Sequence, residues 1–147
     1  MLDVADKPSS LYNLKADFTV VCFWDPNCGH CKEVVPRLDS VFQASWKAHN
    51  VKIYAVLTPD GKQDAKPQWL DFIKNQNLSD WVHVYQTKEM DAENIAAQKP
   101  GFRQLYDITM TPILYLLDKD KRIIGKKLTW EQMNELLEVK WRSTPAN

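Results

Sequence analysis

The sequence has little cysteine, no net charge and no long hydrophobic run, and each absence excludes a class of protein. Its 147 residues include only three cysteines, too few for a scaffold held together by disulfides and an odd number for full pairing. Nineteen basic residues balance nineteen acidic ones, so nothing suggests the basic surface that binds nucleic acids. No apolar run approaches the length of about 20 residues that spans a membrane. We therefore expect no nucleic-acid partner and no membrane insertion by this segment.

The first residues also lack the basic and hydrophobic regions of a signal peptide. Residues 1–10 are polar and contain a Pro-Ser-Ser sequence, which predicts a loose lead-in or linker. With 44% hydrophobic residues in the chain, residues 11–147 suit a single domain that buries a proper core. Residues 11–14 are expected to form a short edge segment of that domain. Such a beginning is also compatible with a piece cut from a longer exported protein.

Strands and helices are predicted to alternate along this domain. Apolar and β-branched runs indicate strands at residues 18–24, 51–57 and 81–85, and a hairpin at residues 113–117 and 122–127. Helices are predicted after each of the three strands, and Thr129 with Gln132 forms a capping box that opens a closing helix. The order predicts an α/β fold, a central mixed sheet flanked by helices on both faces.

The first helix is predicted to run from Cys28 to about His49. Its apolar positions follow helical spacing and are Val34, Leu38, Val41, Phe42 and Trp46. Pro36 lies inside it and should kink it by removing one hydrogen bond.

Two cysteines stand where this helix begins. A thiol at a helix N-terminus faces unsatisfied backbone N–H groups and the positive end of the helix dipole, so the pKa of Cys28 should be lowered. Cys31 lies about one turn further on, close enough to form a disulfide with Cys28 or to resolve a mixed disulfide. Structural zinc needs four ligands, and the chain offers three cysteines and three scattered histidines, so we expect no metal site. His49 and His83 are isolated in the sequence and are expected at the surface.

Three features together resemble the thioredoxin fold, and the resemblance covers most of the chain. The first is Phe23-Trp24-x-x-x-Cys28-x-x-Cys31-Lys32 with a proline five residues after the second cysteine, and the second is Thr111-Pro112 before a hairpin strand. The terminal hairpin and helix form the third. Extra strand and helix material at residues 51–85 resembles the TlpA-like branch, which is common among exported bacterial oxidoreductases. The resemblance therefore implies a periplasmic or otherwise exported bacterial setting.

The resemblance also implies roles for individual residues. Cys28 would be the attacking nucleophile and Cys31 the resolving thiol, tuned by the neighbouring positions Gly29, His30, Trp24 and Pro36. The Gly29-His30 pair matches the Cys-Gly-His-Cys motif of protein disulfide isomerases, and an imidazole there would favour the Cys28 thiolate. The alternative is that His30 is a solvent-exposed turn residue with little effect.

Substrate binding is implied at Thr111 and Pro112. A cis bond before Pro112 would leave the backbone of Thr111 free to pair with an extended substrate segment as a short added strand. The alternative is an ordinary trans proline leading into the strand.

The expected proton acceptor for the resolving thiol is missing. Thioredoxins usually carry a buried aspartate six residues before the first cysteine, where this chain has Cys22, and TlpA-like proteins often use a glutamate where it has Val34. Cys22 is predicted to be a small buried hydrophobe, with a second redox role as the alternative. Glu33 should point away from the site. Asp25 remains a candidate acceptor to which the family gives no role.

The sequence as a whole predicts a thiol-disulfide oxidoreductase that reduces, oxidises or isomerises protein disulfides without a dissociable cofactor. Its partners would be protein thiols or disulfides and a redox partner that the sequence does not identify. The alternative is an interaction module of thioredoxin fold, one part of a longer exported protein, that recognises a partner through Thr111 and Pro112 with little turnover.

Overall fold

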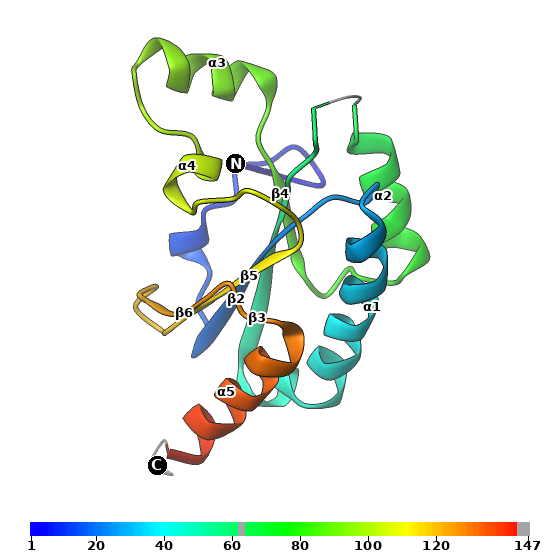
Figure 1. Ribbon diagram of the computed structural model, residues 1–147, viewed down its shortest axis with the longest axis vertical. Helices are drawn as coiled ribbons and strands as arrows, with labels where there is room; N and C mark the ends of the chain where they lie inside the picture. The colour runs from blue at the N-terminus through cyan, green and yellow to red at the C-terminus, as the bar shows by residue number, and fades with distance from the viewer. Residues whose placement is uncertain (62–63, 144–147) are drawn as a thin grey trace.

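A mixed β-sheet forms the centre of the computed structural model, which describes residues 1–61 and 64–143 (Figure 1). Within those residues six strands lie in the order β1-β4-β3-β2-β5-β6. Their bounds are β1 (Leu2–Asp3), β2 (Phe18–Trp24), β3 (Val51–Leu57), β4 (Val82–Tyr85), β5 (Ile113–Leu117) and β6 (Ile123–Lys126). Strands β2, β3 and β4 are parallel, whereas β1, β5 and β6 each run antiparallel to the neighbour they pair with. The predicted strands and hairpin are confirmed.

Strand β2 is central because its sequence is apolar on both faces. It pairs with β3 on one side and β5 on the other, with Cys22 opposite Ala55 and Leu114. Six of its seven residues are buried. Alternate side chains enter two separate cores, with Val20, Cys22 and Trp24 in one and Val21 and Phe23 in the other. A continuous apolar run is what a strand covered on both faces requires.

The helices divide between the two faces as the strand connections dictate. The crossovers from β2 to β3 and from β3 to β4 run in the same direction across the sheet, so right-handed connections place α1 (Gly29–Ala44) and α2 (Lys66–Asn75) on one face. Helix α5 (Trp130–Ser143) shares their core. The return to β5 places α4 (Phe102–Leu105) in the other core. This arrangement confirms the predicted α/β fold.

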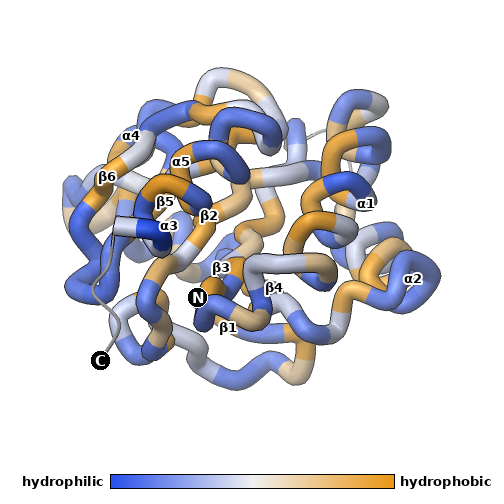
Figure 2. The backbone as a smooth tube through the Cα atoms, turned by 90° about the horizontal axis from the view of Figure 1, so that it is seen from below, coloured by the Kyte–Doolittle hydropathy of each residue, from blue (hydrophilic) through white to orange (hydrophobic). Residues whose placement is uncertain are grey.

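The remaining α-helix, α3 (Lys88–Ala96), contributes little to the interior. It has no buried residue, and it projects from the rest of the molecule at the top of Figure 1. In Figure 2 the apolar segments of the chain gather around the sheet, and the outer turns of the helices are mostly polar. No helix within residues 1–61 and 64–143 is both long and apolar enough to cross a membrane.

Helix α1 is shorter than predicted and buries a different valine. It ends at Ala44, Ser45 leaves helical geometry, and a 3-10 turn η2 (Trp46–His49) follows. Its buried residues are Cys31, Val35, Leu38 and Phe42. Val34, predicted to face the core, is only half-buried. Pro36 lies inside the helix as predicted.

The predicted loose lead-in is part of the sheet. Leu2 pairs with Tyr85, which makes β1 an edge strand beside β4. The Tyr54 hydroxyl donates a hydrogen bond of 3.0 Å to the carbonyl of Ser9. The edge segment expected at residues 11–14 is instead a 3-10 turn η1 (Leu11–Asn13), capped by the Ser10 side chain. The contacts of Leu2 with Tyr85 and of Ser9 with Tyr54 join residues that are distant in sequence, which local composition does not reveal.

His83 is buried, and its predicted surface position is wrong. Its ring stacks on Trp81 with centroids 5.6 Å apart and planes 15° from parallel. Its Nε2 donates a hydrogen bond of 2.8 Å to the carbonyl of Leu78. Burial lowers the pKa of His83 to about 4, so the ring is neutral at neutral pH. His49 is exposed, as predicted, and stacks on Trp141 with centroids 4.1 Å apart.

The pKa of His83 predicts how stability depends on pH. Between about 6.5, its ordinary pKa, and about 4, the unfolded chain binds a proton here that the folded chain excludes. The free energy of unfolding should therefore fall as pH decreases through this range, by a total on the order of 3 kcal/mol.

Urea unfolding at a series of pH values measures this component. His83→Phe should remove it, whereas His49→Gln, at an exposed ring, should keep it. An unchanged pH dependence in His83→Phe would contradict the assignment.

Candidate active site

The two cysteines of the motif lie at the start of α1, where β2 ends in a tight turn. Asp25 organises that turn: its Oδ1 accepts a hydrogen bond of 2.9 Å from the Asn27 N–H, and its carbonyl accepts one of 3.1 Å from the Cys28 N–H. Cys28 is the N-cap residue of α1, in extended conformation. Its side chain is thus placed beside backbone N–H groups that have no partner within the helix.

The Cys28 thiol is the accessible member of the pair. Its Sγ lies 3.6 Å from the carbonyl oxygen of Thr111. Partial burial alone would raise the pKa of Cys28, but hydrogen bonds outweigh it: in decreasing order, those from the Cys31 backbone N–H, the Thr111 side chain, the Cys31 thiol and the His30 backbone N–H. The net effect is a lowered pKa, so more of this thiol is thiolate at neutral pH.

The Cys31 thiol has the opposite character. Its side chain is fully buried, and burial raises its pKa to about 12, although a hydrogen bond from the Asp25 backbone N–H partly offsets that effect. Both cysteines are free thiols. The pair therefore consists of one accessible, activated thiol and one buried, protonated thiol.

The segment carrying Thr111 and Pro112 faces the cysteines from the distant connection before β5. The peptide bond between these two residues is cis, as the resemblance implies. Both residues are partly exposed. Thr111 therefore lies partly exposed beside Cys28, two residues before β5 begins.

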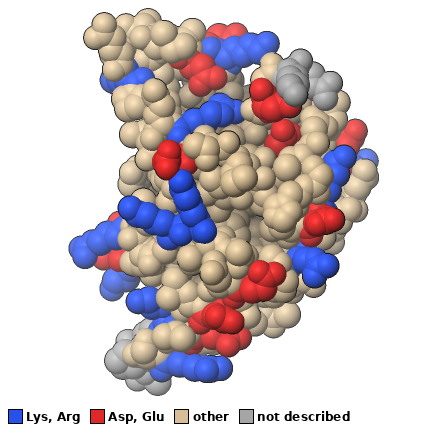
Figure 3. All heavy atoms as spheres, viewed as in Figure 1, with Lys and Arg blue, Asp and Glu red and all other residues tan. Residues whose placement is uncertain are grey.

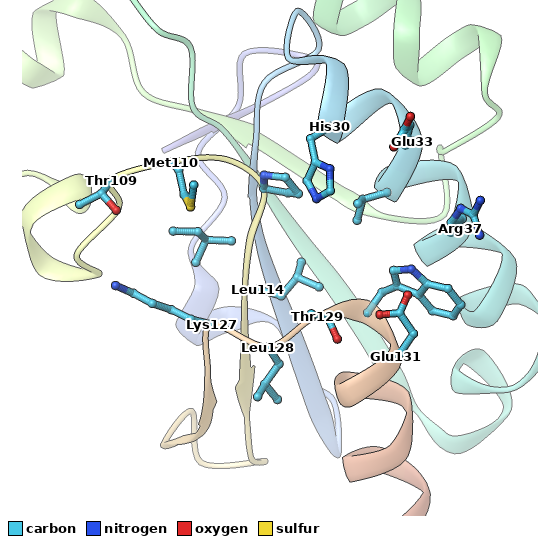
Figure 4. Close-up of a pocket in the computed structure, with 14 residues that line it drawn as sticks. His30, Glu33, Arg37, Thr109, Met110, Leu114, Lys127, Leu128, Thr129 and Glu131 are labelled. Carbon is cyan, nitrogen blue, oxygen red and sulfur yellow. The ribbon is translucent and has the colours of Figure 1, made fainter.

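A groove of about 510 Å³ opens next to this segment (Figure 4). Its walls are the first turns of α1, residues 109–114 and the connection from β6 into α5, and the residues that it exposes include His30, Val34, Met110, Pro112 and Trp130. In Figure 4 the His30 ring points from α1 into the groove.

Four charged side chains are among the residues that line this groove. Glu33 and Arg37 stand on α1, and Glu131 on α5. Lys127 at the opposite end forms an ion pair of 2.7 Å with Asp107. On the face shown in Figure 3, acidic and basic side chains lie beside one another in several places, and uncharged residues cover the centre of the face. The groove is thus suited to an apolar segment with polar flanks.

Met110 and the residues from Lys127 to Glu131 are groove residues that the sequence did not identify. Met110 is 70% exposed, and a large exposed apolar side chain next to the Thr-Pro pair was the available signal. Trp130 fits the helical spacing of apolar residues in the closing helix, yet it lies half-buried in the groove wall. The groove is formed by the start of α1, by residues 109–114 and by residues 127–131, and only the fold brings these three segments together.

The structure places the other tuning candidates as follows. Trp24 is fully buried and packs edge-on against Phe72, with ring centroids 5.2 Å apart, so it supports the site from below. A Cβ added at Gly29 would meet no atom within 4 Å, so packing does not require glycine there. Pro36 lies two turns into α1, away from the thiols.

Cys22 lies in the core beneath the pair. Its side chain is fully buried, and burial, followed by the electrostatic effect of Cys31, raises its pKa well above the ordinary value. A protonated, enclosed thiol fits the predicted role of a small buried hydrophobe. Among the described residues, no group of three or more His, Cys, Asp or Glu side chains is arranged to hold a metal ion.

Comparison with known proteins points to one family. The model for thioredoxin-like proteins matches residues 16–123, well over half of the chain. A domain of a possible thiol-disulfide isomerase from Cytophaga hutchinsonii is 30% identical, with a TM-score of 0.77 over 97% of this chain and 88% of that one. The thioredoxin domain of a thiol-disulfide oxidoreductase from Bacteroides vulgatus is 23% identical, with a TM-score of 0.73 over 95% and 89%. A search of curated proteins found no match.

The contrast between the two thiols predicts selective alkylation. In the reduced protein, iodoacetamide should modify Cys28 first, because its lowered pKa supplies thiolate at a pH where Cys31 remains protonated. The rate of modification against pH, followed by mass spectrometry, gives the Cys28 pKa.

Cys28→Ser should leave the remaining thiols almost unreactive at neutral pH, and Cys31→Ser should retain the fast reaction. A Cys28 thiol that titrates at its ordinary pKa would instead support the interaction module.

Proposed function

The chain belongs to the thioredoxin-like family, and we propose that it is a thiol-disulfide oxidoreductase whose redox pair is Cys28 and Cys31. The observation that carries this proposal is the contrast within the pair. Cys28 is accessible with a lowered pKa, whereas Cys31 is buried with its pKa raised to about 12. An attacking thiol needs the first environment, and a resolving thiol that waits until a mixed disulfide forms is suited to the second.

The reaction in the reducing direction has two exchanges. The Cys28 thiolate attacks one sulfur of a substrate disulfide, which forms a mixed disulfide and releases the other substrate sulfur as a thiolate. Cys31 then loses its proton and attacks the Cys28 sulfur, so that a Cys28–Cys31 disulfide forms and the second substrate sulfur leaves as a thiolate. Two electrons pass from the protein dithiol to the substrate, and the two released thiolates take up protons. The reverse sequence oxidises a substrate dithiol.

The substrate is proposed to be an extended protein segment that bears the cysteine. Thr111 lies partly exposed beside Cys28, and apolar and charged side chains line the neighbouring groove. Main-chain pairing with Thr111 would position the substrate sulfur, and one or two apolar side chains would occupy the groove. The name of the Cytophaga hutchinsonii domain, a possible thiol-disulfide isomerase, agrees with a protein substrate.

We propose a TlpA-like role outside the bacterial cytoplasm, with a second thiol-disulfide protein as the redox partner. The support is the strand and helix material between residues 51 and 85, together with bacterial neighbours named as oxidoreductases. Fractionation of a bacterium that expresses the gene, with detection by antibody, should recover the protein from the periplasm or from another fraction outside the cytoplasm. Recovery from the cytoplasm would contradict this assignment.

Turnover should depend on Cys28. In an insulin-reduction assay driven by a dithiol, Cys28→Ser should reduce the rate to that of the uncatalysed reaction, because no other described thiol combines exposure with a lowered pKa. Cys22→Ala is the matched control and should keep nearly full activity. Wild-type turnover in Cys28→Ser would disprove the proposed reaction.

Loss of the resolving thiol should trap substrates. Cys31→Ser, incubated with oxidised protein substrates, should accumulate mixed disulfides through Cys28 that a reductant releases. Non-reducing electrophoresis detects them, and a variant lacking Cys28 as well should capture nothing. Equal capture by both variants would show that the roles are assigned incorrectly.

A further inference from the structure

The buried thiol of the pair must lose a proton in every catalytic cycle, and the surroundings of Cys31 contain few groups that can accept it. Cys22 below it is a protonated thiol, and Val34 on α1 is apolar. Glu33 is exposed on the groove side of α1. His83 lies within an aromatic cluster, and with a pKa of about 4 it holds a proton poorly at neutral pH.

Asp25 is different from these groups in both burial and position. Within residues 1–61 and 64–143 it is the only carboxylate among the buried side chains, with 6% of its surface exposed. Its backbone N–H is hydrogen-bonded to the Cys31 sulfur, and its carbonyl accepts from the Cys28 N–H. Covalent geometry keeps a carboxylate oxygen within about 4 Å of its own backbone nitrogen. The carboxylate therefore lies in the same turn as the Cys31 sulfur, at a separation that water can bridge.

A second cavity connects this carboxylate to solvent. It has a volume of about 180 Å³ and is lined by Asp25, Thr58, Asp60, Arg103 and Thr111, among other residues. Its volume is sufficient for several waters. It shares Thr109 and Met110 with the groove but none of the groove residues of α1 or α5. A substrate that pairs with Thr111 and fills the groove therefore meets only the Thr109–Thr111 side of this cavity, and the side formed by Asp25, Thr58 and Arg103 stays open to water.

The titratable and charged groups around the Asp25 carboxylate come from three segments. The thiols of Cys28 and Cys31 belong to the start of α1. Asp60, in the loop after β3, and Arg103, on α4, line the second cavity together with Asp25. The Arg103 guanidinium donates a hydrogen bond of 2.7 Å to the carbonyl of Pro59, which holds it at the cavity wall.

From this arrangement we propose that Asp25 is the proton acceptor for Cys31, which rests on the redox function proposed above. In the resolving step the Cys31 proton passes to the Asp25 carboxylate, the Cys31 thiolate attacks the Cys28 sulfur, and the Cys28–Cys31 disulfide forms as the substrate thiolate leaves. The protonated carboxyl returns its proton to the departing thiolate or to the water of the second cavity. Asp25 thereby supplies the acid-base group that neither Cys22 nor Val34 can provide.

The test measures the rates of the two successive thiol-disulfide exchanges separately. The reduced protein reacts with one equivalent of dithiobis-nitrobenzoate, an aromatic disulfide whose released thiolate absorbs visible light. The first release reports attack by Cys28, and the second reports attack by Cys31 on the mixed disulfide. Stopped-flow absorbance across a range of pH measures both rates.

Asp25→Asn is the informative variant, because an amide oxygen still accepts the hydrogen bond from Asn27 but cannot take a proton. We expect it to slow the second release about 10-fold or more at neutral pH and to leave the first within about twofold. The difference from the wild type should shrink as pH rises, because hydroxide then removes the Cys31 proton. Asp25→Glu should restore part of the second rate, and Glu93→Gln, at an exposed carboxylate of α3 outside both cavities, should change neither rate.

Two results would overturn the role of Asp25. One is a second release in Asp25→Asn at the wild-type rate, and the other is an equal slowing of both releases with no change in pH profile, which would indicate a purely structural role. A wild-type protein without a second release, or a Cys31→Ser variant that retains it, would instead refute the proposed redox function itself. The two failures are thus distinguishable.

Discussion

The hydrogen bonds from the first backbone N–H groups of α1 to the Cys28 sulfur are the interaction on which the site depends. Partial burial opposes ionisation of this thiol, and these bonds, together with those from the side chains of Thr111 and Cys31, reverse the effect. They require the helix to begin at that residue, which in turn requires the turn built by Asp25. The position of that turn is set by β2, which is held between two neighbouring strands and covered on both faces. The chemistry of one sulfur therefore relies on a strand that is buried on both faces of the sheet.

The antiparallel strand β5 supplies the other half of the site. It pairs with β2 along five residues, from Thr19 opposite Leu117 to Phe23 opposite Ile113. This register brings Thr111 and Pro112, just before β5, level with the end of β2 and next to Cys28. The same pairing that stabilises the sheet thus brings the partly exposed Thr111 within contact distance of the thiol. A shift of this register by one residue would reverse the faces of the strand and separate the two.

Local sequence was sufficient to predict the central strands, the hairpin and the closing helix, because each carries its own signal. Thr129 and Gln132 exchange the two hydrogen bonds of the expected capping box, at 3.0 and 3.1 Å. Features that depend on distant partners were not predictable in this way. The two residues of β1 become a strand only by pairing with β4, and His83 is buried only because Trp81 and its neighbours enclose it. The groove joins three segments that lie far apart in the sequence.

The choice between Val34 and Val35 shows how far the sequence alone can predict the site. Both fit an apolar stripe, and a rotation of about 100 degrees per residue decides which one enters the core. The cysteine at position 31 sets that rotation, because Cys31 and Val35 are four residues apart and are buried together. Val34 is thereby directed to the groove, where a carboxylate would meet substrate.

The position of Asp25 also has an energetic advantage over that of Cys22. A carboxylate at position 22 would be fully enclosed between the sheet and α1, where the charged form loses its hydration. At the end of β2 the carboxylate is nearly buried, yet it accepts a backbone hydrogen bond and borders a cavity that can hold water. The carboxylate therefore stays near Cys31 without being enclosed in the core. Placing the acid-base group at the strand end leaves the strand itself without a charged residue, and the helix start that activates Cys28 depends on that strand.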